Sequence, residues 1–495
     1  MDSLNELVKI LDDTDFKQFK QYLQSRNKRD DVKNLELLNL LKTDDIDSLN
    51  RLYNCDKNKD AYHALRKRLQ ENLLIFLSNK TFETSHSESQ NALRLLVVAR
   101  YLLENDLVKL AFRCLKKAEV MAERAEQFNL LNEILLLKLQ YAHLPQAGNF
   151  DLITARFTQN QLCMQSEANL NVAYAYLRQQ LHFINQEGRI VNLTSLVIAT
   201  IRKYKISVAD LMTYKSVYQI LFIANEYAAI QQNYQLIERF VNRVNRFIEL
   251  RSAENKSHTY YQIQVLYYLA NFHLRQKNFM RSMGYLNEMM AIMQGGKYNQ
   301  VFFMQHQLLY ALNKFFTGSA DDAIDVLQAA LTGKSNNAKL EDMEDLRICI
   351  AMFMALNDNR KSLKHLSMLN QTDAWYEKKM GMLWSIRKHL MEVLIYAQFS
   401  NFELAASRLQ SFRRRYKSYL LKTSEQRVLN YLKLVERYLV NPNVIDDERY
   451  KRSVHEMANA EQNNDIFTLS FIGWLIARWE KSSTYEIVLN LIKIK

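Results

Sequence analysis

The sequence predicts an all-α protein, an α-solenoid of stacked helical hairpins that follows a small helical N-terminal domain. The first reason is composition: the 495 residues include 2 Pro and 9 Gly, where average usage would give roughly 25 and 35. Folds with many strands need both residues at their turns. The second reason is a pair of compact residues twelve positions apart, with copies starting at residues 224, 270, 311, 351 and 393. Such regular self-similarity is typical of helical repeat proteins.

Residues 1–80 form the first predicted element, the small helical N-terminal domain. Phe16, Phe19 and Leu23 lie on one face of a predicted helix. The later stretch KDAYHALRKRLQENLLIFLSNK has the pattern of a longer amphipathic helix. The polar string NKTFETSHSESQ (79–90) is interpreted as a linker, so we expect this domain to be separate from the repeats.

The second predicted element is the series of hairpins, residues 90–440. Two antiparallel helices can approach closely only where their facing side chains are small, and an apolar residue one turn later then packs against the next hairpin. The clear copies are Ala99/Ala111/Leu115, Ala270/Ser282/Leu286 and Ala311/Ala323/Leu327. The weaker copies are Val393/Ala405/Leu409, Ala224/Leu236/Phe240 and Ala351/Leu363/Ser367. Each hairpin leaves an apolar face that a neighbour must cover, so the hairpins are expected to stack.

Two other stretches complete the predicted organisation. Between Leu130 and Val217 the helical pattern is interrupted at HLPQAGNF (143–150) and at NQEGRIVNL (185–193). By length, two further hairpins would fit there. Residues 441–495 are expected to form C-terminal helices that cap the last hairpin.

These hairpins resemble the tetratricopeptide repeat (TPR). That family places a small residue at its eighth position, Ala at its twentieth, a large apolar residue at its twenty-fourth and Ala at its twenty-seventh. The matching sets are Ala99/Ala111/Leu115/Ala118, Ala311/Ala323/Leu327/Ala330 and, in most positions, Ala270/Ser282/Leu286/Met289. The sequence departs from the family in its longer period, since TPR units have 34 residues, and in lacking the closing Pro and the early Trp. The resemblance implies a divergent, right-handed TPR-like solenoid whose first helices line a concave groove.

Charge, cysteine content and apolar runs indicate a soluble, cytoplasmic protein. The net charge of +13 is spread along the chain, without a basic tail at its start. The four Cys lie far apart, without metal-binding or redox spacing, and are interpreted as small apolar residues in a reducing compartment. The N-terminus lacks a secretory signal pattern. The apolar run 466–479 is too short to span a bilayer and contains an Arg.

The sequence contains no set of residues that indicates a particular chemical reaction. Nucleotide-binding, zinc-protease, hydrolase and calcium-loop motifs are absent from it, and the ten His are scattered. His273 stands where the TPR resemblance implies an aromatic packing residue. The acidic cluster EDMED (341–345) could suggest metal ligands, but its place before an apolar run favours a helix start, where the helix dipole stabilises acids. We therefore expect no enzymatic activity, no cofactor and no metal.

A polar stripe marks the predicted groove. Gln264, Tyr267, Asn271 and Arg275 lie on one face of a first helix, and Asn225 holds the matching position one hairpin earlier. In peptide-binding TPR proteins, Asn, Arg and Lys at such positions grip a peptide's backbone or carboxylate, and the resemblance implies the same role here. Amide and guanidinium groups suit that role because they pair with extended peptide groups. The alternative is that the stripe is only solvated.

Two basic stretches support a different interpretation. They are Arg239, Arg243 and Arg246 on one ridge, and Arg413, Arg414, Arg415 and Lys417 among aromatic residues. Basic residues interleaved with aromatics can bind RNA by phosphate contacts and stacking. Both stretches lie on predicted second helices, outside the groove, where a solvated face is the simpler explanation.

The sequence therefore predicts a non-enzymatic scaffold or adaptor that binds another protein in the concave groove. The bound segment can be a peptide or a helix, because another first helix places Leu308, Leu312 and Phe315 at the groove positions instead of polar residues. For the same reason we expect no conventional two-carboxylate clamp. The alternative is a protein that associates with RNA or DNA through its basic second helices.

Overall fold

The computed structural model describes residues 3–26, 32–43, 59–84, 87–207, 212–231, 233–251, 258–294, 298–333, 339–423, 425–460, 465–480 and 482–494. Within these ranges the protein is helical and has no β-strand, which confirms the all-α class. Contacts group the chain into two units, Met1–Leu130 with Gln140–Gly148 and Leu131–Leu139 with Asn149–Lys495. No helix in the described ranges combines the length and the apolar character that a bilayer crossing needs.

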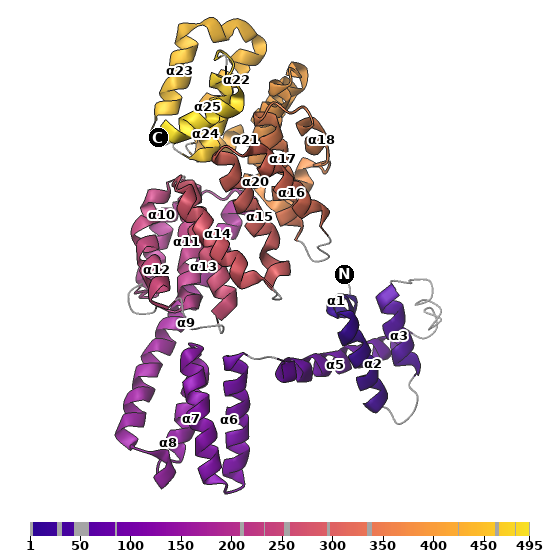
Figure 1. Cartoon of the computed structure of the whole chain (residues 1–495), viewed down its shortest axis with the longest axis vertical. Coiled ribbons are helices and arrows are strands. Elements are labelled where there is room, and N and C mark those ends of the chain that lie inside the picture. The colour runs from indigo at the N-terminus through magenta and orange to yellow at the C-terminus, as the bar shows by residue number, and fades with distance from the viewer. Residues whose placement is uncertain are drawn as a thin grey trace. The chain divides into compact units, whose positions relative to one another are not determined.

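In its described residues, the first unit begins with four helices around a core of their own. They are α1 (Ser3–Ile10), α2 (Asp13–Arg26), α3 (Val32–Thr43) and α5 (Lys59–Thr84) (Figure 1). Phe19 is fully buried in this core and packs on Phe76 of α5. Because α5 continues to Thr84, the linker predicted over 79–90 is wrong for most of its length. The stretch is polar, but it contains no Gly or Pro to end the helix.

A hairpin of α6 (Glu88–Glu104) and α7 (Val108–Arg124) follows in the first unit. Ala99 on α6 and Ala111 on α7 are both fully buried, and the two helices are in contact. After it come α8 (Phe128–Gln140), of which residues 131–139 belong to the second unit, and the 3-10 helix η1 (Pro145–Ala147) of the first unit. The sequence thus located this hairpin from its paired small residues.

The second unit contains the remaining helices. They are α9 (Phe150–Glu187), α10 (Leu193–Lys203), α11 (Tyr214–Gln231), η2 (Tyr234–Ile237), α12 (Glu238–Arg251), α13 (Thr259–Arg275), α14 (Phe279–Met293), α15 (Tyr298–Phe316), α16 (Ala320–Thr332), α17 (Leu340–Leu356), α18 (Ser362–Ser367), α19 (Asp373–Met380), α20 (Met382–Gln398), α21 (Phe402–Lys422), α22 (Gln426–Val440), η4 (Pro442–Asp446), α23 (Glu448–Asn459), α24 (Ile466–Ile476) and α25 (Thr484–Ile494). The breaks predicted at 143–150 and 185–193 are confirmed. The two hairpins predicted in this region are wrong, because α9 runs unbroken for 38 residues and its sequence contains no Gly or Pro.

Helical hairpins follow one another through this unit. The pairs α13–α14, α15–α16, α17–α18 and α20–α21 are each in contact, and the first helices α11, α13, α15, α17 and α20 contact one another in that order (Figure 1). One apolar core extends from Ile263 to Ile492. The C-terminal helices α22–α25 therefore share a core with the hairpins.

The close approaches predicted within the hairpins are present at several copies. The Ser282 hydroxyl donates a hydrogen bond to the Ala270 carbonyl across 2.8 Å, and Ala311 and Ala323 are both fully buried. His273 is buried and stacks on Tyr285, as expected for a packing residue.

Two of the weaker copies are out of register. In the α17–α18 hairpin it is Ser362, one residue before the expected Leu363, that donates its hydroxyl hydrogen to the Ala351 carbonyl at 2.5 Å. In the copy that starts at residue 224, Leu236 is 53% exposed, whereas Ile237 is buried. A shift of one position reverses the burial of a helical residue, so sequence spacing alone could not fix these registers.

The hairpin turns explain why the chain needs so little glycine. Asp106, Lys277, Asp358 and Ser400 adopt positive φ angles of 53 to 61° just after first helices. The next residue then bonds back to a carbonyl five positions earlier, as from Asn278 N to His273 O at 2.8 Å. This is the Schellman arrangement, which usually uses Gly at the left-handed position. Here Asp, Lys and Ser take that position, and Gly318 does so once.

Candidate functional site

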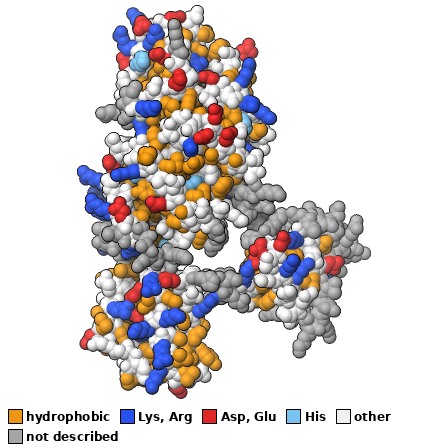
Figure 2. All heavy atoms as spheres, in the orientation of Figure 1, with side chains coloured by type: hydrophobic (Ala, Val, Ile, Leu, Met, Phe, Trp, Pro, Cys, Tyr) orange, Lys and Arg blue, Asp and Glu red, His pale blue; other side chains and the backbone are white. Residues whose placement is uncertain are grey.

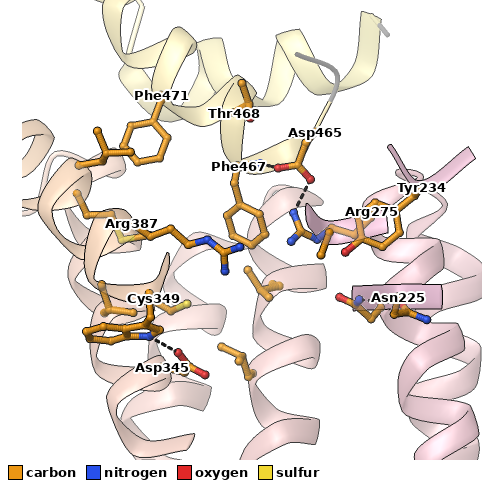
Figure 3. A pocket seen from close by; sticks show the side chains of 18 of the residues that line it. Asn225, Tyr234, Arg275, Asp345, Cys349, Arg387, Asp465, Phe467, Thr468 and Phe471 are labelled. Atoms are coloured by element: carbon orange, nitrogen blue, oxygen red, sulfur yellow. Dashed lines mark hydrogen bonds and ion pairs between the residues drawn. The ribbon is translucent and has the colours of Figure 1, made fainter. Parts of the chain in front are cut away.

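A pocket of about 520 Å³ lies within the second unit. Its lining comes from the first helices α11, α13, α15, α17 and α20 and from the C-terminal helices α22, α23 and α24. This volume lies in the range of about 300–1,000 Å³ that is usual for ligand pockets. The first helices therefore do form one wall of a cavity, and the C-terminal helices form another (Figure 3).

Helical spacing brings the lining side chains to the same face of each helix. On α13, Tyr267, Asn271 and Arg275 are separated by four residues each, and on α15 Leu308 and Leu312 are as well. Residues four apart lie one turn apart on one helix face. The polar stripe read from the sequence is thus a real face of α13, directed into the pocket.

Four of the five predicted groove residues line this pocket. They are Asn225, Tyr267, Asn271 and Arg275. Gln264 is half-buried near the other end of α13 and is not among the lining residues. The stripe is therefore shorter than the sequence predicted.

Asn225 and Asn271 are tied to each other across two first helices. The Asn271 amide donates to the Asn225 side-chain oxygen at 3.2 Å, and the Asn225 amide donates to the Leu221 carbonyl at 3.0 Å. Asn225 is almost fully buried. Its hydrogen-bonding groups therefore hold α11 against α13, and Asn271 is the more accessible of the two.

Arg275 is bound by the chain's own C-terminal region. Its guanidinium forms an ion pair with Asp465, which lies just before α24, and the Phe467 ring lies over it at 4.5 Å (Figure 3). Burial by itself disfavours the charged guanidinium, but the nearby Asp465 outweighs it and the pKa of Arg275 is raised. The sequence predicted that Arg275 binds a partner protein, but in the fold its guanidinium already binds Asp465 of the same chain.

Arg387 is the candidate binding residue that the sequence reasoning missed. It lies on α20, is exposed, and extends into the pocket toward Phe467 (Figure 3). Among the described residues it has no hydrogen-bond or ion-pair partner, whereas Arg427 of the same pocket is bound to Glu425 at 2.9 Å. The sequence held no signal for it, because only the packed helices show that this Arg faces the pocket.

Two acidic side chains lie in the pocket wall, Glu226 on α11 and Asp345 on α17. Burial raises the pKa of Asp345 to about 6, although Trp384 Nε1 donates to its carboxylate at 2.7 Å. Burial also raises the pKa of Glu226, which accepts a hydrogen bond from Asn185 Nδ2 at 3.3 Å. Neither acid has a close cationic partner among the described residues.

Asp345 belongs to the acidic cluster 341–345. Glu341 and Asp342 lie in the first turn of α17, as the helix-start interpretation predicted. Asp345 lies one turn later and faces the pocket instead. In the described part of the chain no three His, Cys, Asp or Glu side chains are grouped so that they could hold a metal ion.

Burial also shifts the pKa of uncharged groups in the pocket wall. Burial raises the pKa of Tyr267 and of Tyr268. Burial raises the pKa of the Cys349 thiol as well, and the nearby Asp345 raises it further. Because the thiolate is the reactive form of cysteine, this arrangement does not activate Cys349 as a nucleophile.

The two predicted basic surfaces differ from each other. Arg239, Arg243 and Arg246 are exposed on α12 and have no ion-pair partner among the described residues. The second surface is partly neutralised, because Arg413 pairs with Glu436 and Arg415 pairs with Glu377 at 2.6 Å. Arg414 and Lys417 remain exposed beside them. On the face drawn in Figure 2, Lys and Arg are interspersed with Asp and Glu.

Comparison with known proteins identifies no relative. No protein-family model matches the chain, and no curated protein sequence matches it.

Proposed function

We propose that this chain is a non-enzymatic, cytoplasmic scaffold or adaptor, built as a divergent TPR-like solenoid, that binds a segment of another protein in the pocket between its first helices and α24. One observation carries the proposal. Asn225, Tyr267, Asn271 and Arg275, chosen from the sequence as groove residues, line a single water-accessible pocket. The stacked first helices supply an extended, preorganised wall for such a segment.

The chemistry of the pocket supports binding rather than catalysis. Its walls combine apolar and aromatic side chains with a few charged groups, as ligand sites generally do. A nucleophile activated by an adjacent base is the usual sign of covalent catalysis, whereas burial and the nearby Asp345 both raise the pKa of the Cys349 thiol in this lining.

Affinity purification with pocket-filled variants tests this proposal. Ala229→Trp fills the pocket from α11 and Thr468→Trp fills it from α24, since both residues line it. Arg414→Gln is the matched control, because Arg414 is exposed on α21 away from the lining. We expect specific proteins that co-purify with the wild type and the control to be lost with both filled variants. Equal recovery with all four chains, each shown to be folded by melting, would reject the pocket as the binding site.

The exposed Arg ridge of α12 supports a second candidate function, association with RNA or DNA. Three Arg at helical spacing form a cationic ridge that can neutralise phosphates. Arg239→Gln, Arg243→Gln and Arg246→Gln together should lower the salt concentration at which the protein leaves a heparin column. The test is specific if Arg414→Gln and Lys417→Gln change elution less. Unchanged elution of the triple variant would exclude this ridge.

A further inference from the structure

Three charged side chains of the pocket lack a partner of opposite charge in the part of the chain that the structure describes. Arg387, Glu226 and Asp345 form no ion pair with any residue in the described ranges. Glu226 accepts a hydrogen bond only from the neutral Asn185 amide at 3.3 Å, and Asp345 only from the neutral Trp384 indole at 2.7 Å. We call these three side chains the unpaired charges.

The other charged groups in the lining are already matched within the chain. Arg275 is paired with Asp465, and Arg427 with Glu425 at 2.9 Å. These pairs are largely buried and belong to the packing of the C-terminal helices. The unpaired charges are therefore the groups left for a bound molecule to neutralise.

An apolar occupant would leave these charges uncompensated. A segment entering the pocket displaces the water that now solvates Arg387 and the accessible edges of the two carboxylates. Burying an ion without a partner is strongly unfavourable, whereas a partner of opposite charge with good hydrogen bonds offsets the loss of water. The sequence allowed either a peptide or a helix as the bound segment. A purely apolar helix is disfavoured, because it would leave the three charges without partners.

The unpaired charges come from three different first helices. Arg387 is on α20, Glu226 on α11 and Asp345 on α17. The positive charge of Arg387 lowers the pKa of both acids, so it is electrostatically close to them. It is nevertheless beyond ion-pair distance. A bound segment with one acidic and one basic side chain could lie between Arg387 and the two acids and contact both.

We propose that the pocket binds a segment of a partner protein that presents an acidic side chain to Arg387 and a basic side chain to Glu226 and Asp345. This inference rests on the proposed function and adds the chemistry of the partner to it. The apolar stems of Lys and Arg suit the aromatic and aliphatic walls, among them Tyr268 and Leu308.

Peptide display on the full-length protein tests the proposal. A random peptide library is selected against the wild type, against Arg387→Gln and against Glu226→Gln combined with Asp345→Asn. The two acid substitutions keep shape, and Asn can still accept the Trp384 hydrogen bond, whereas Arg387→Gln removes the charge and shortens the side chain. Arg414→Gln is the control for loss of a surface charge.

We expect the wild type and the control to select peptides with both an acid and a base. Arg387→Gln should lose the preference for the acid and keep the preference for the base, and the double acid variant should do the reverse. A wild-type peptide should bind each variant about tenfold to a hundredfold more weakly, because each variant loses hydrogen bonds that involve a charged group.

The possible outcomes distinguish a failure of this inference from a failure of the proposed function. Peptides that Ala229→Trp excludes, but that lack the two charges or bind Arg387→Gln unchanged, would overturn the inference and leave the proposed function standing. Selection of no peptide that Ala229→Trp excludes would overturn both. A short single-stranded RNA that binds the wild type and is lost with Arg387→Gln would assign this guanidinium to phosphate and overturn the inference.

Discussion

Arg275 on α13 forms an ion pair with Asp465, 190 residues later in the chain. Their side chains are only 16% and 11% exposed. The pair joins the C-terminal helix α24 to the wall of first helices and helps to close the pocket. The sequence predicted that Arg275 binds the backbone or carboxylate of a partner peptide. In the fold it binds the carboxylate of Asp465 instead.

Removing the charge of Asp465 should destabilise the protein. Asp465→Asn keeps a good helix N-cap but leaves Arg275 largely buried without its counter-ion, which we expect to cost about 2–3 kcal/mol. Urea denaturation measures the change. The exposed pair Glu187–Arg189 is the control, since Glu187→Ala should cost at most about 0.5 kcal/mol. Equal effects at both sites would mean that Asp465 is solvated in solution.

Enlarging a close helix approach should also destabilise the fold. Ala311 is fully buried in α15, so Ala311→Leu should cost about 1–3 kcal/mol through overpacking. Ala168 is exposed on α9, and Ala168→Leu should be nearly neutral. Thermal melting of the two variants compares them, and a neutral effect at Ala311 would show that the helices do not approach closely there.

The left-handed turn residues predict an unusual response to glycine. Ser400 has a φ of 61°, where a side chain is strained by about 1–2 kcal/mol. Ser400→Gly relieves that strain, and the greater freedom of the unfolded chain offsets about 0.4–1 kcal/mol of the gain. We therefore expect no loss of stability. Lys117→Gly, at an exposed position inside α7, should instead cost about 1 kcal/mol. A similar loss at both positions would contradict the turn geometry.

The sequence predicted those parts of the fold that depend on residues close together in the chain. The stripe from Tyr267 to Arg275 is one helix face, and the small pair Ala270 and Ser282 spans a single hairpin, so periodicity sufficed for both. The left-handed conformation of turn residues such as Ser400 could not be predicted from the sequence, because it follows from the Schellman hydrogen bonds and not from the preference of the residue type. Arg387 could not be found either, because its importance comes from lacking a partner, which only the packed helices define.

Cys349 should resist thiol reagents although it lines the pocket. Burial raises its pKa above the usual range, so little reactive thiolate is present at neutral pH. Cys114, Cys163 and Cys349 are all partly exposed, so the raised pKa of Cys349 should make iodoacetamide alkylate it after the other two. Peptide mass spectrometry after short exposures gives the order. Faster labelling of Cys349 would mean that the pocket is more open and more polar than described.

Asp345 should make the stability of the protein depend on pH in an identifiable direction. Its carboxyl has a usual pKa of 3.8, and burial raises this pKa to about 6 in the folded protein. The folded state therefore holds the proton more tightly than the unfolded state does, so the contribution of this group to stability falls as pH rises from 3.8 to about 6.

Asp345→Asn removes this contribution because Asn does not titrate. The difference in unfolding free energy, variant minus wild type, should increase as pH rises through that window and level off above it. Urea denaturation of both proteins across the window measures the difference, in which all other titrating groups cancel. A difference for Asp345→Asn that stays constant across the window would mean that water solvates its carboxylate as fully in the fold as in the unfolded chain.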